Sequence, residues 1–213
     1  MLGFCLTIGR HYFIKKIKMK RYSYPLLCLC FFLWFTPFVP SLKWGHIETT
    51  RWQKDKGQTQ LQLKLDQLIK TEKISPYAIY ATIAAEDYHF FRHRGFNLQA
   101  IINSIHHNYK QNRYAVGAST ITQQVIKLTL LSPEKNIIRK LRELLGSILA
   151  EFILTKNEIL SWYFSLANYG QGLYGIDEAS RSYFNTTPDQ LTLNQAIYLA
   201  MVLPKPNTLS KSI

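Results

Sequence analysis

After Pro76 the chain repeats apolar residues at the spacing of amphipathic helices, with polar or small residues between them. This pattern predicts a mainly α fold, with helices over 77–91, 97–112, from about 120 onward, 132–154, 155–166, 176–184 and from 192 onward. Residues suited to helix starts precede them: Pro76, Asn97 and the capping boxes Thr120-x-x-Gln123, Thr155-x-x-Glu158 and Thr192-x-x-Gln195. No strand pairs or internal repeats stand out.

The longest predicted helix opens at Ser132-Pro133-Glu134 and carries its apolar residues in one stripe at helical period. The stripe consists of Ile137, Leu141, Leu144/Leu145, Ile148 and Phe152. Glu143 therefore lies on the polar side of this helix. Further on, Gly170, Gly172 and Gly175 predict a turn, and Pro204 and Pro206 end the last helix.

The N-terminal 42 residues have a different pattern, with a basic segment followed by an uncharged, largely apolar one. Six Lys/Arg precede the 21 uncharged residues of 22–42, a length that spans a bilayer as a helix. Prolines at 25, 37 and 40 shorten the clean apolar core, as in a signal peptide, but no small-x-small cleavage site follows. We expect a cytoplasmic basic segment at 1–21, a transmembrane signal anchor at 22–42, a connecting segment at 43–75 and the globular domain at 76–213. Met19 is an alternative start.

Composition narrows the function. Of the 213 residues, 47% are hydrophobic, a share that is large enough to form a core and that argues against a disordered chain. The net charge is +13. Residues 43–213 hold 20 Lys/Arg against 13 Asp/Glu, a basic balance that suits an anionic lipid or a phosphorylated substrate. No nucleic-acid-binding signature occurs, so we expect no nucleic-acid partner. All three cysteines precede residue 43, which leaves the globular part without a disulfide framework.

Two adjacent acids, Glu86 and Asp87, close a run of small and apolar residues. Partial desolvation at the end of such a helix would raise a carboxyl pKa and suit it to proton transfer. By spacing alone, two solvated surface acids remain the simpler interpretation.

Glu143 follows two cations at i+4 and i+3 spacing in Arg139-Lys140-x-x-Glu143. This pattern fits a salt-bridged helix surface, and it also fits a cationic ledge that binds phosphate around an acid. The segment from Gly117 to Lys127 is rich in small and hydrogen-bonding residues at a helix start, where backbone amides favour anions. Its simpler interpretation is a well-capped helix.

A metal site is the other possibility at the first acid pair, because Glu86, His89 and His93 share a helical face near His106-His107. Di-iron bundles need a second Glu-x-x-His, and this chain has neither that copy nor an HExxH motif. We predict no metal-ligating residues.

Three ordered motifs carry a resemblance that covers about residues 70–206. They are Glu86-Asp87-x-x-Phe90-x-x-His93-x-Gly95, Gly117-x-Ser119-Thr120-Ile121-Thr122-Gln123-Gln124-x-x-Lys127 and Arg139-Lys140-x-x-Glu143. In order and spacing they resemble the first three signature motifs of the peptidoglycan glycosyltransferases. Lys156-x-Glu158-Ile159-Leu160-x-x-Tyr163 resembles the fourth, and the Leu203-Pro204 close resembles the monofunctional branch.

The resemblance implies a lysozyme-like, α-rich fold and the inverting polymerisation of lipid II into β-1,4-linked glycan. By match, Glu86 would be the general base, while Glu143, with Lys127, Arg139 and Lys140, would receive the diphosphate, alone or with Mg²⁺ or Mn²⁺. The donor and acceptor sites would be lined by Asp87, Ser119, Thr120, Gln123 and Gln124, and the turn shaped by Phe90, His93 and Gly95. Implied partners are lipid II, the growing glycan strand, membrane lipid and cell-wall synthesis or division proteins. The implied location is the bacterial inner membrane, single-pass, with the catalytic domain on the periplasmic side.

The sequence departs from the family pattern at several positions. Leu128, Ser165 and Asn168 stand where the family usually has Asn, Asn and an acid, and Gln195 replaces a common Glu. The family's fifth motif is not found before Ile213. These departures favour one alternative, a catalytically weak member that acts as a scaffold in the wall-synthesis complex. A separate alternative is a lysozyme-like hydrolase that cleaves the same polymer. A hydrolase has no need of the cations at 127, 139 and 140.

Overall fold

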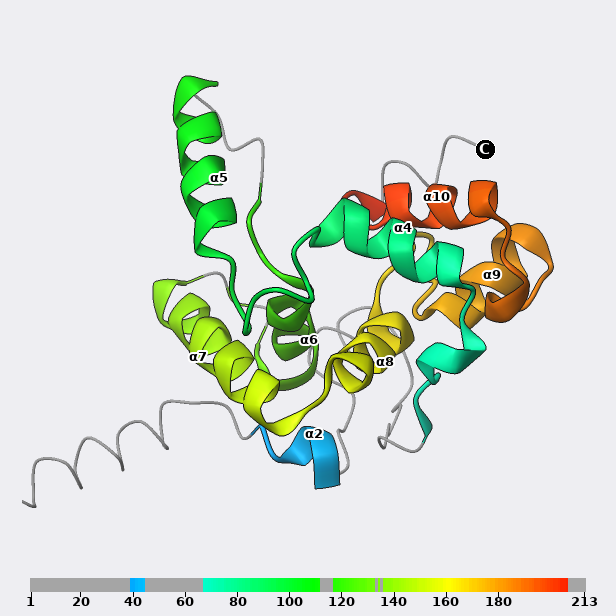
Figure 1. Ribbon diagram of the computed structural model, residues 1–213, viewed down its shortest axis with the longest axis horizontal. Helices are drawn as coiled ribbons and strands as arrows, with labels where there is room; N and C mark the ends of the chain where they lie inside the picture. The colour runs from blue at the N-terminus through cyan, green and yellow to red at the C-terminus, as the bar shows by residue number, and fades with distance from the viewer. Residues whose placement is uncertain (1–38, 45–66, 112–116, 133, 135, 207–213) are drawn as a thin grey trace, which may run out of the picture. The chain divides into compact units, whose positions relative to one another are not determined.

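The computed structural model describes residues 39–44, 67–111, 117–132, 134 and 136–206. This part of the chain is mainly helical, as predicted, and contains no strand, only an isolated antiparallel bridge between Asn168 and Tyr174. The α-helices are α2 (Ser41–Trp44), α4 (Pro76–Glu86), α5 (Leu98–Lys110), α6 (Ile121–Leu130), α7 (Ile137–Ile153), α8 (Lys156–Leu166), α9 (Ile176–Phe184) and α10 (Leu193–Val202). Two short 3-10 helices, η2 (Thr71–Lys73) and η3 (Pro188–Gln190), complete the set (Figure 1).

Local capping fixes four of the helix starts, as the sequence predicts. The Asn97 side chain accepts from the backbone N–H of Ala100 at the start of α5. All three predicted capping boxes form, so that α6, α8 and α10 begin directly after their threonines.

Two helix boundaries differ from the prediction. Helix α4 ends at Glu86 rather than Phe91, because Asp87 leaves the helical conformation and its side chain accepts a hydrogen bond from the backbone N–H of Ile121. Helix α7 begins at Ile137 rather than near residue 132, because the Asn136 side chain caps the N–H of Arg139. Both corrections come from polar side chains that satisfy backbone groups.

The core is built around α8, which packs against α6 and α9 (Figure 1). Most of its side chains are buried: Ile159, Leu160, Ser161, Trp162, Tyr163, Phe164 and Leu166. On the other side of α6 lies α7, and α4 packs along α10. Glu86, at the end of α4, thus belongs to the helix pair α4 and α10, while α6 and α7 form another pair.

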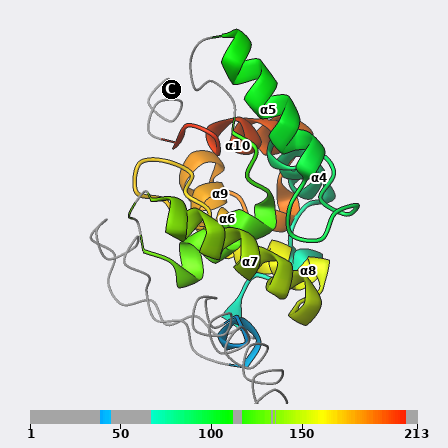
Figure 2. The same ribbon diagram turned by 90° about the vertical axis from the view of Figure 1, so that its left-hand side faces the viewer.

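Two helices expose apolar residues. Helix α5 stands away from the other helices in Figure 1, whereas in the turned view of Figure 2 it is drawn across α10 and α4. It exposes Leu98, Ile102, Ile105 and Tyr109, which form one stripe along its length. Helix α7 exposes Ile137, Leu141 and Phe152 of its apolar stripe, while its buried residues are Glu143, Gly146, Ser147 and Ala150. An amphipathic pattern normally implies the reverse.

Most of the predicted anchor at 22–42 lies outside the described residues. Of its last four, Val39 and Leu42 are fully buried. Next to them, Lys43 Nζ donates to the Ile153 carbonyl at 3.2 Å and lies 3.4 Å from Glu158. Within the ranges given above, no helix is both long enough and apolar enough to cross a bilayer.

Candidate active site

Glu86 is the last residue of α4, and its carboxylate is held from α6. Gln124 Nε2 donates a hydrogen bond of 2.6 Å to Glu86 Oε2. Burial raises the pKa of Glu86, an effect opposed by this hydrogen bond and by Lys127 and reinforced by Asp87. A partly desolvated carboxylate with a raised pKa is suited to take up a proton near neutral pH.

Asp87 is buried and joins three segments. Its Oδ2 accepts from the Ile121 N–H at 3.0 Å, at the start of α6, and also lies 2.9 Å from His93 Nε2. The carboxylate thus closes the loop at residues 87–95 on itself and fastens it to α6. Asp87 was predicted to line the substrate sites, and its position is directly beside Glu86.

Gly95 ends this loop against the backbone of α7. Its φ of +91° is a conformation that other residues avoid, and a Cβ there would lie 2.7 Å from the carbonyl carbon of Ser147. From the other side, Thr120 Oγ1 donates to the Gly95 carbonyl at 2.7 Å. The expectation that Gly95 and His93 shape the turn agrees with these contacts.

The motif after Gly117 divides into two groups. Thr120 and Gln123 are buried and bond each other's backbone in the capping box of α6. Gln124 reaches Glu86, and Ser119 Oγ accepts from Lys140 Nζ at 2.9 Å. Of the four residues of this motif that were predicted to line the substrate sites, Thr120 and Gln123 therefore hold the helix start. Gln124 bonds the acid, and Ser119 bonds a cation.

A cation cluster of Lys127, Arg139 and Lys140 surrounds Glu143. Glu143 is 1% exposed, with Arg139 Nη1 at 2.8 Å and Lys140 Nζ at 2.5 Å from its two oxygens. Burial lowers the pKa of Lys127; the charge of Glu143 opposes this shift, and those of Lys140 and Arg139 add to it. One buried anion against three cations leaves a positive surface, half exposed at Lys140, that suits a diphosphate.

The charge of Glu86 links the two parts of the site. It acts on Lys127, and it raises the pKa of Tyr163 and Tyr169 beyond the effect of their complete burial. Both phenols therefore lie within electrostatic range of the carboxylate. Sequence reasoning gave Tyr163 no role and Tyr169 no mention.

Each of the four residues that depart from the family pattern packs or hydrogen-bonds within the fold. Leu128 packs against the core. Ser165 Oγ accepts from the Ile69 N–H at 3.1 Å, at the wall of a cavity of about 740 Å³ that none of the predicted site residues lines. Asn168 Oδ1 accepts from the Gly170 N–H, and Gln195 completes the cap of α10. None of these described partners is Glu86 or Glu143.

The donor set does not fit a resident metal. In the described part of the chain, no three His, Cys, Asp or Glu side chains come together as ligands. Both oxygens of Glu143 are already bonded by cations, and His93 bonds Asp87. Mg²⁺ binds through one or two carboxylates together with phosphate oxygens, and the one carboxylate of the cluster, Glu143, is buried and bonded to Arg139 and Lys140.

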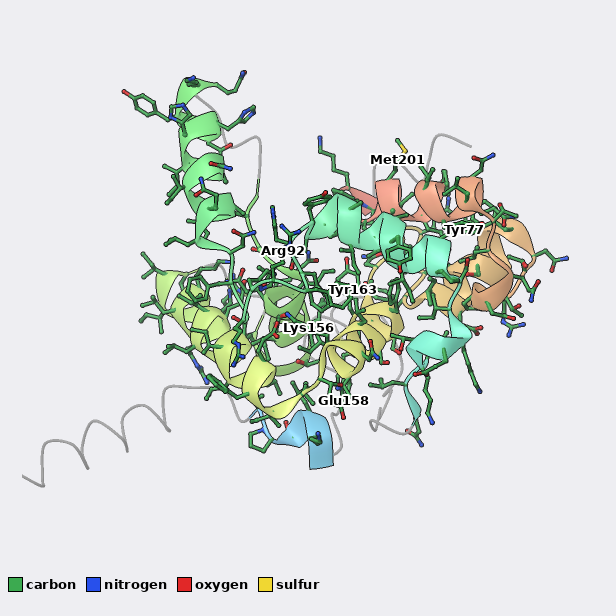
Figure 3. All side chains as sticks on the ribbon, in the orientation of Figure 1. Tyr77, Arg92, Lys156, Glu158, Tyr163 and Met201 are labelled. Carbon is green, nitrogen blue, oxygen red and sulfur yellow. The ribbon has the colours of Figure 1, made fainter. Side chains whose placement is uncertain are left out.

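A further polar group went unnoticed in the sequence. Lys156 of α8 and Thr122 of α6 both donate to Glu151 Oε1 of α7, next to the 87–95 loop (Figure 3). The signal that could have found it is the lysine itself, because a cation at the first position of a helix opposes the helix dipole.

Comparison with known proteins agrees with this arrangement. A family profile described as Transglycosylase matches residues 55–212. The chain is similar to proteins named "Biosynthetic peptidoglycan transglycosylase": 40% identical over 138 residues to that of Haemophilus influenzae (65% of this chain, 56% of the relative), and 34% over 190 residues to that of Nitrosomonas eutropha (89% and 76%). It is 42% identical over 138 residues to that of Mannheimia succiniciproducens, of which it covers 56%. The chain thus spans less than two thirds of the length of two of these three relatives, and it belongs to the transglycosylase family.

Proposed function

We propose that the protein is an inverting peptidoglycan glycosyltransferase with a lysozyme-like fold, which polymerises lipid II into β-1,4-linked glycan strands and releases polyprenyl diphosphate. The proposal rests on one observation: a partly desolvated base, Glu86, interacts electrostatically with Lys127, which belongs to the cation cluster. The names of the relatives support the same activity.

In this reaction Glu86 takes the proton of the acceptor sugar hydroxyl. The hydroxyl oxygen bonds to the anomeric carbon of the donor, while the bond from that carbon to the diphosphate oxygen breaks on the opposite face. Gln124 holds the carboxylate in place, which a general base requires.

Negative charge then develops on the departing diphosphate. The cation cluster supplies fixed positive charge for it, and Glu143 keeps Arg139 and Lys140 aligned. A divalent cation, Mg²⁺ or Mn²⁺, would accompany the diphosphate, since both oxygens of Glu143 already bond Arg139 and Lys140. No step is assigned to such an ion.

The proposal includes the membrane. A signal anchor at 22–42 would hold the domain from 76 onward at the periplasmic face of the inner membrane, where lipid II, the glycan strand and other wall-synthesis or division proteins are found. The exposed apolar residues of α5 and α7 support a lipid surface as a partner. Anchoring would keep the enzyme in the plane of its lipid substrate.

The test is polymerisation of labelled lipid II by detergent-solubilised protein, with wild type beside Glu86→Gln. We expect strands from the wild type and a loss of about 10²–10⁴ in rate in the variant, as for other general bases. Glu72→Gln, which neutralises an exposed carboxylate on η2, is the matched control and retains activity. A folded wild type that makes no strands in any detergent or divalent metal would overturn the proposal.

A further inference from the structure

Lys156 is the first residue of α8 and makes three contacts beneath the 87–95 loop. Its Nζ donates to the His93 carbonyl at 2.9 Å and to Glu151 Oε1 at 2.7 Å. It also lies 4.2 Å from the centre of the Phe90 ring, which is fully buried. Two of these three partners belong to the 87–95 loop.

Glu151 extends the contact to a third helix. The same Oε1 accepts from Thr122 Oγ1 at 2.6 Å, and Thr122 is fully buried on α6. One ion pair, with its side chains 23% and 4% exposed, therefore connects the loop to α6, α7 and α8. Ion pairs that are this desolvated depend on further hydrogen bonds, which the His93 carbonyl and Thr122 Oγ1 supply here.

The position of Lys156 is costly for its own helix. A positive charge in the first turn opposes the helix dipole, and the capping box at Thr155 already satisfies the helix start without it. A residue that contradicts a local preference marks a site where a longer-range role outweighs it. The longer-range role here is the 87–95 loop.

The loop in turn positions Glu86. His93, whose carbonyl Lys156 holds, bonds the carboxylate of Asp87, the residue next to Glu86. Asp87 also holds the first N–H of α6, the helix from which Gln124 bonds Glu86. Two short paths thus run from Lys156 to the carboxylate of Glu86.

We propose that Lys156 is a positioning residue that fixes the 87–95 loop and, through it, the carboxylate of Glu86. It does not touch the reacting atoms. The proposal rests on the glycosyltransferase function proposed above, and it assigns to the Lys156–Glu151 pair a part in the rate of the reaction rather than in binding of the substrate.

The chain offers a matched control for this lysine. Lys43 also lies at the junction of α7 and α8 and also contacts one carbonyl and one carboxylate, those of Ile153 and Glu158, but it has no bond to the loop. Lys→Met at either position keeps an unbranched apolar stem and removes the charge. A difference between the two variants therefore reports the loop contact and not the loss of a lysine at this junction.

The experiment compares wild type, Lys156→Met and Lys43→Met as full chains in detergent. We expect kcat for lipid II polymerisation to fall about 100-fold in Lys156→Met, with KM within about threefold, as when a catalytic group is displaced by a distance of order 1 Å. Lys43→Met keeps kcat within about threefold, even where it lowers the Tm equally. Equal losses of kcat in both variants would overturn the proposal.

A second readout needs no substrate. The side-chain amide resonances of Gln124, assigned by their loss in Gln124→Ala, report its bond to Glu86. We expect them to shift in Lys156→Met and not in Lys43→Met, and unshifted resonances in Lys156→Met would contradict the proposal. An inactive wild type would refute the glycosyltransferase function, and this shift would still decide the role of Lys156.

A milder variant covers the case in which Lys156→Met does not fold. Glu151→Gln keeps both acceptor geometry and volume and removes the charge that holds Lys156. We expect the Gln124 amide resonances to move in the same direction by a smaller amount, with kcat about tenfold lower. If neither the Gln124 resonances nor kcat changed, the proposed positioning role of Lys156 would be refuted.

Discussion

Helices α7 and α8 follow one another in the chain and bury opposite kinds of residue. Helix α8 buries most of its side chains, with Trp162 and Phe164 fully enclosed. Helix α7 buries Glu143, Gly146, Ser147 and Ala150 and leaves Ile137 79% and Leu141 50% exposed. One is a core helix, and the other has its polar side turned inward.

The difference shows how the molecule separates stability from chemistry. The small buried residues of α7 let the 87–95 loop reach its backbone at Ser147, and Glu143 gathers the cation cluster there. Neither of these two contacts buries much apolar surface, so the position of α7 depends on the helices that pack against it. Helix α8 provides the apolar packing on which α6 and the site rest.

The largest expected effect tests the role of α8. Trp162→Ala removes a fully buried indole and leaves a cavity, so we expect a loss of about 3–5 kcal/mol in the free energy of unfolding. Denaturant titration followed by circular dichroism measures it. A loss below about 1 kcal/mol, the mean for point mutants in general, would mean that α8 is not the core of this fold.

Sequence reasoning succeeded where the information was local. Each capping box joins a threonine to a residue three positions away, and all three formed as predicted. The end of α4 could not be predicted in this way, because Asp87 bonds a backbone group 34 residues distant.

The buried side of α7 was equally out of reach. Its apolar stripe indicates a helix correctly, but only the packing of α6 against it and the cations on two helices make a buried Glu143 tolerable. The catalytic acids were identified by resemblance, and their roles stay predictions. Thr120 and Gln123 form the cap of α6, and their predicted place at the substrate stays a prediction.

Glu86 allows a second test, of intermediate size, because its charge acts on the core helix α8, where it raises the pKa of Tyr163. Its pKa is raised in the folded protein, so the folded state holds the proton more tightly than the unfolded chain and loses stability as pH rises from about 4.5 through the folded pKa. Glu86→Gln should therefore raise the Tm at pH 7, by about 2–4 °C for each kcal/mol gained.

The pH profile of this difference is the sharper observation. Below about pH 4.5 the carboxyl is protonated in both states, so the gain in Tm should disappear there. Differential scanning calorimetry from pH 4 to pH 8 gives the profile, with Glu72→Gln as the exposed control. A gain that is the same at every pH would show that desolvation of Glu86 is not its cause.

The smallest effect on stability is expected on the exposed side of α7. Leu141→Gln exchanges one good helix former for another at a half-exposed position, so the free energy of unfolding should change by less than about 0.5 kcal/mol. If this side faces lipid, the same change should weaken binding of the domain to vesicles that contain anionic lipid, measured by co-sedimentation. Leu193→Gln on α10, also about half exposed, is the matched control and leaves vesicle binding unchanged. Equal binding by both variants would mean that α7 exposes its apolar residues for some other reason than contact with lipid, while a large loss of stability in Leu141→Gln would mean that its apolar side is covered in the folded protein.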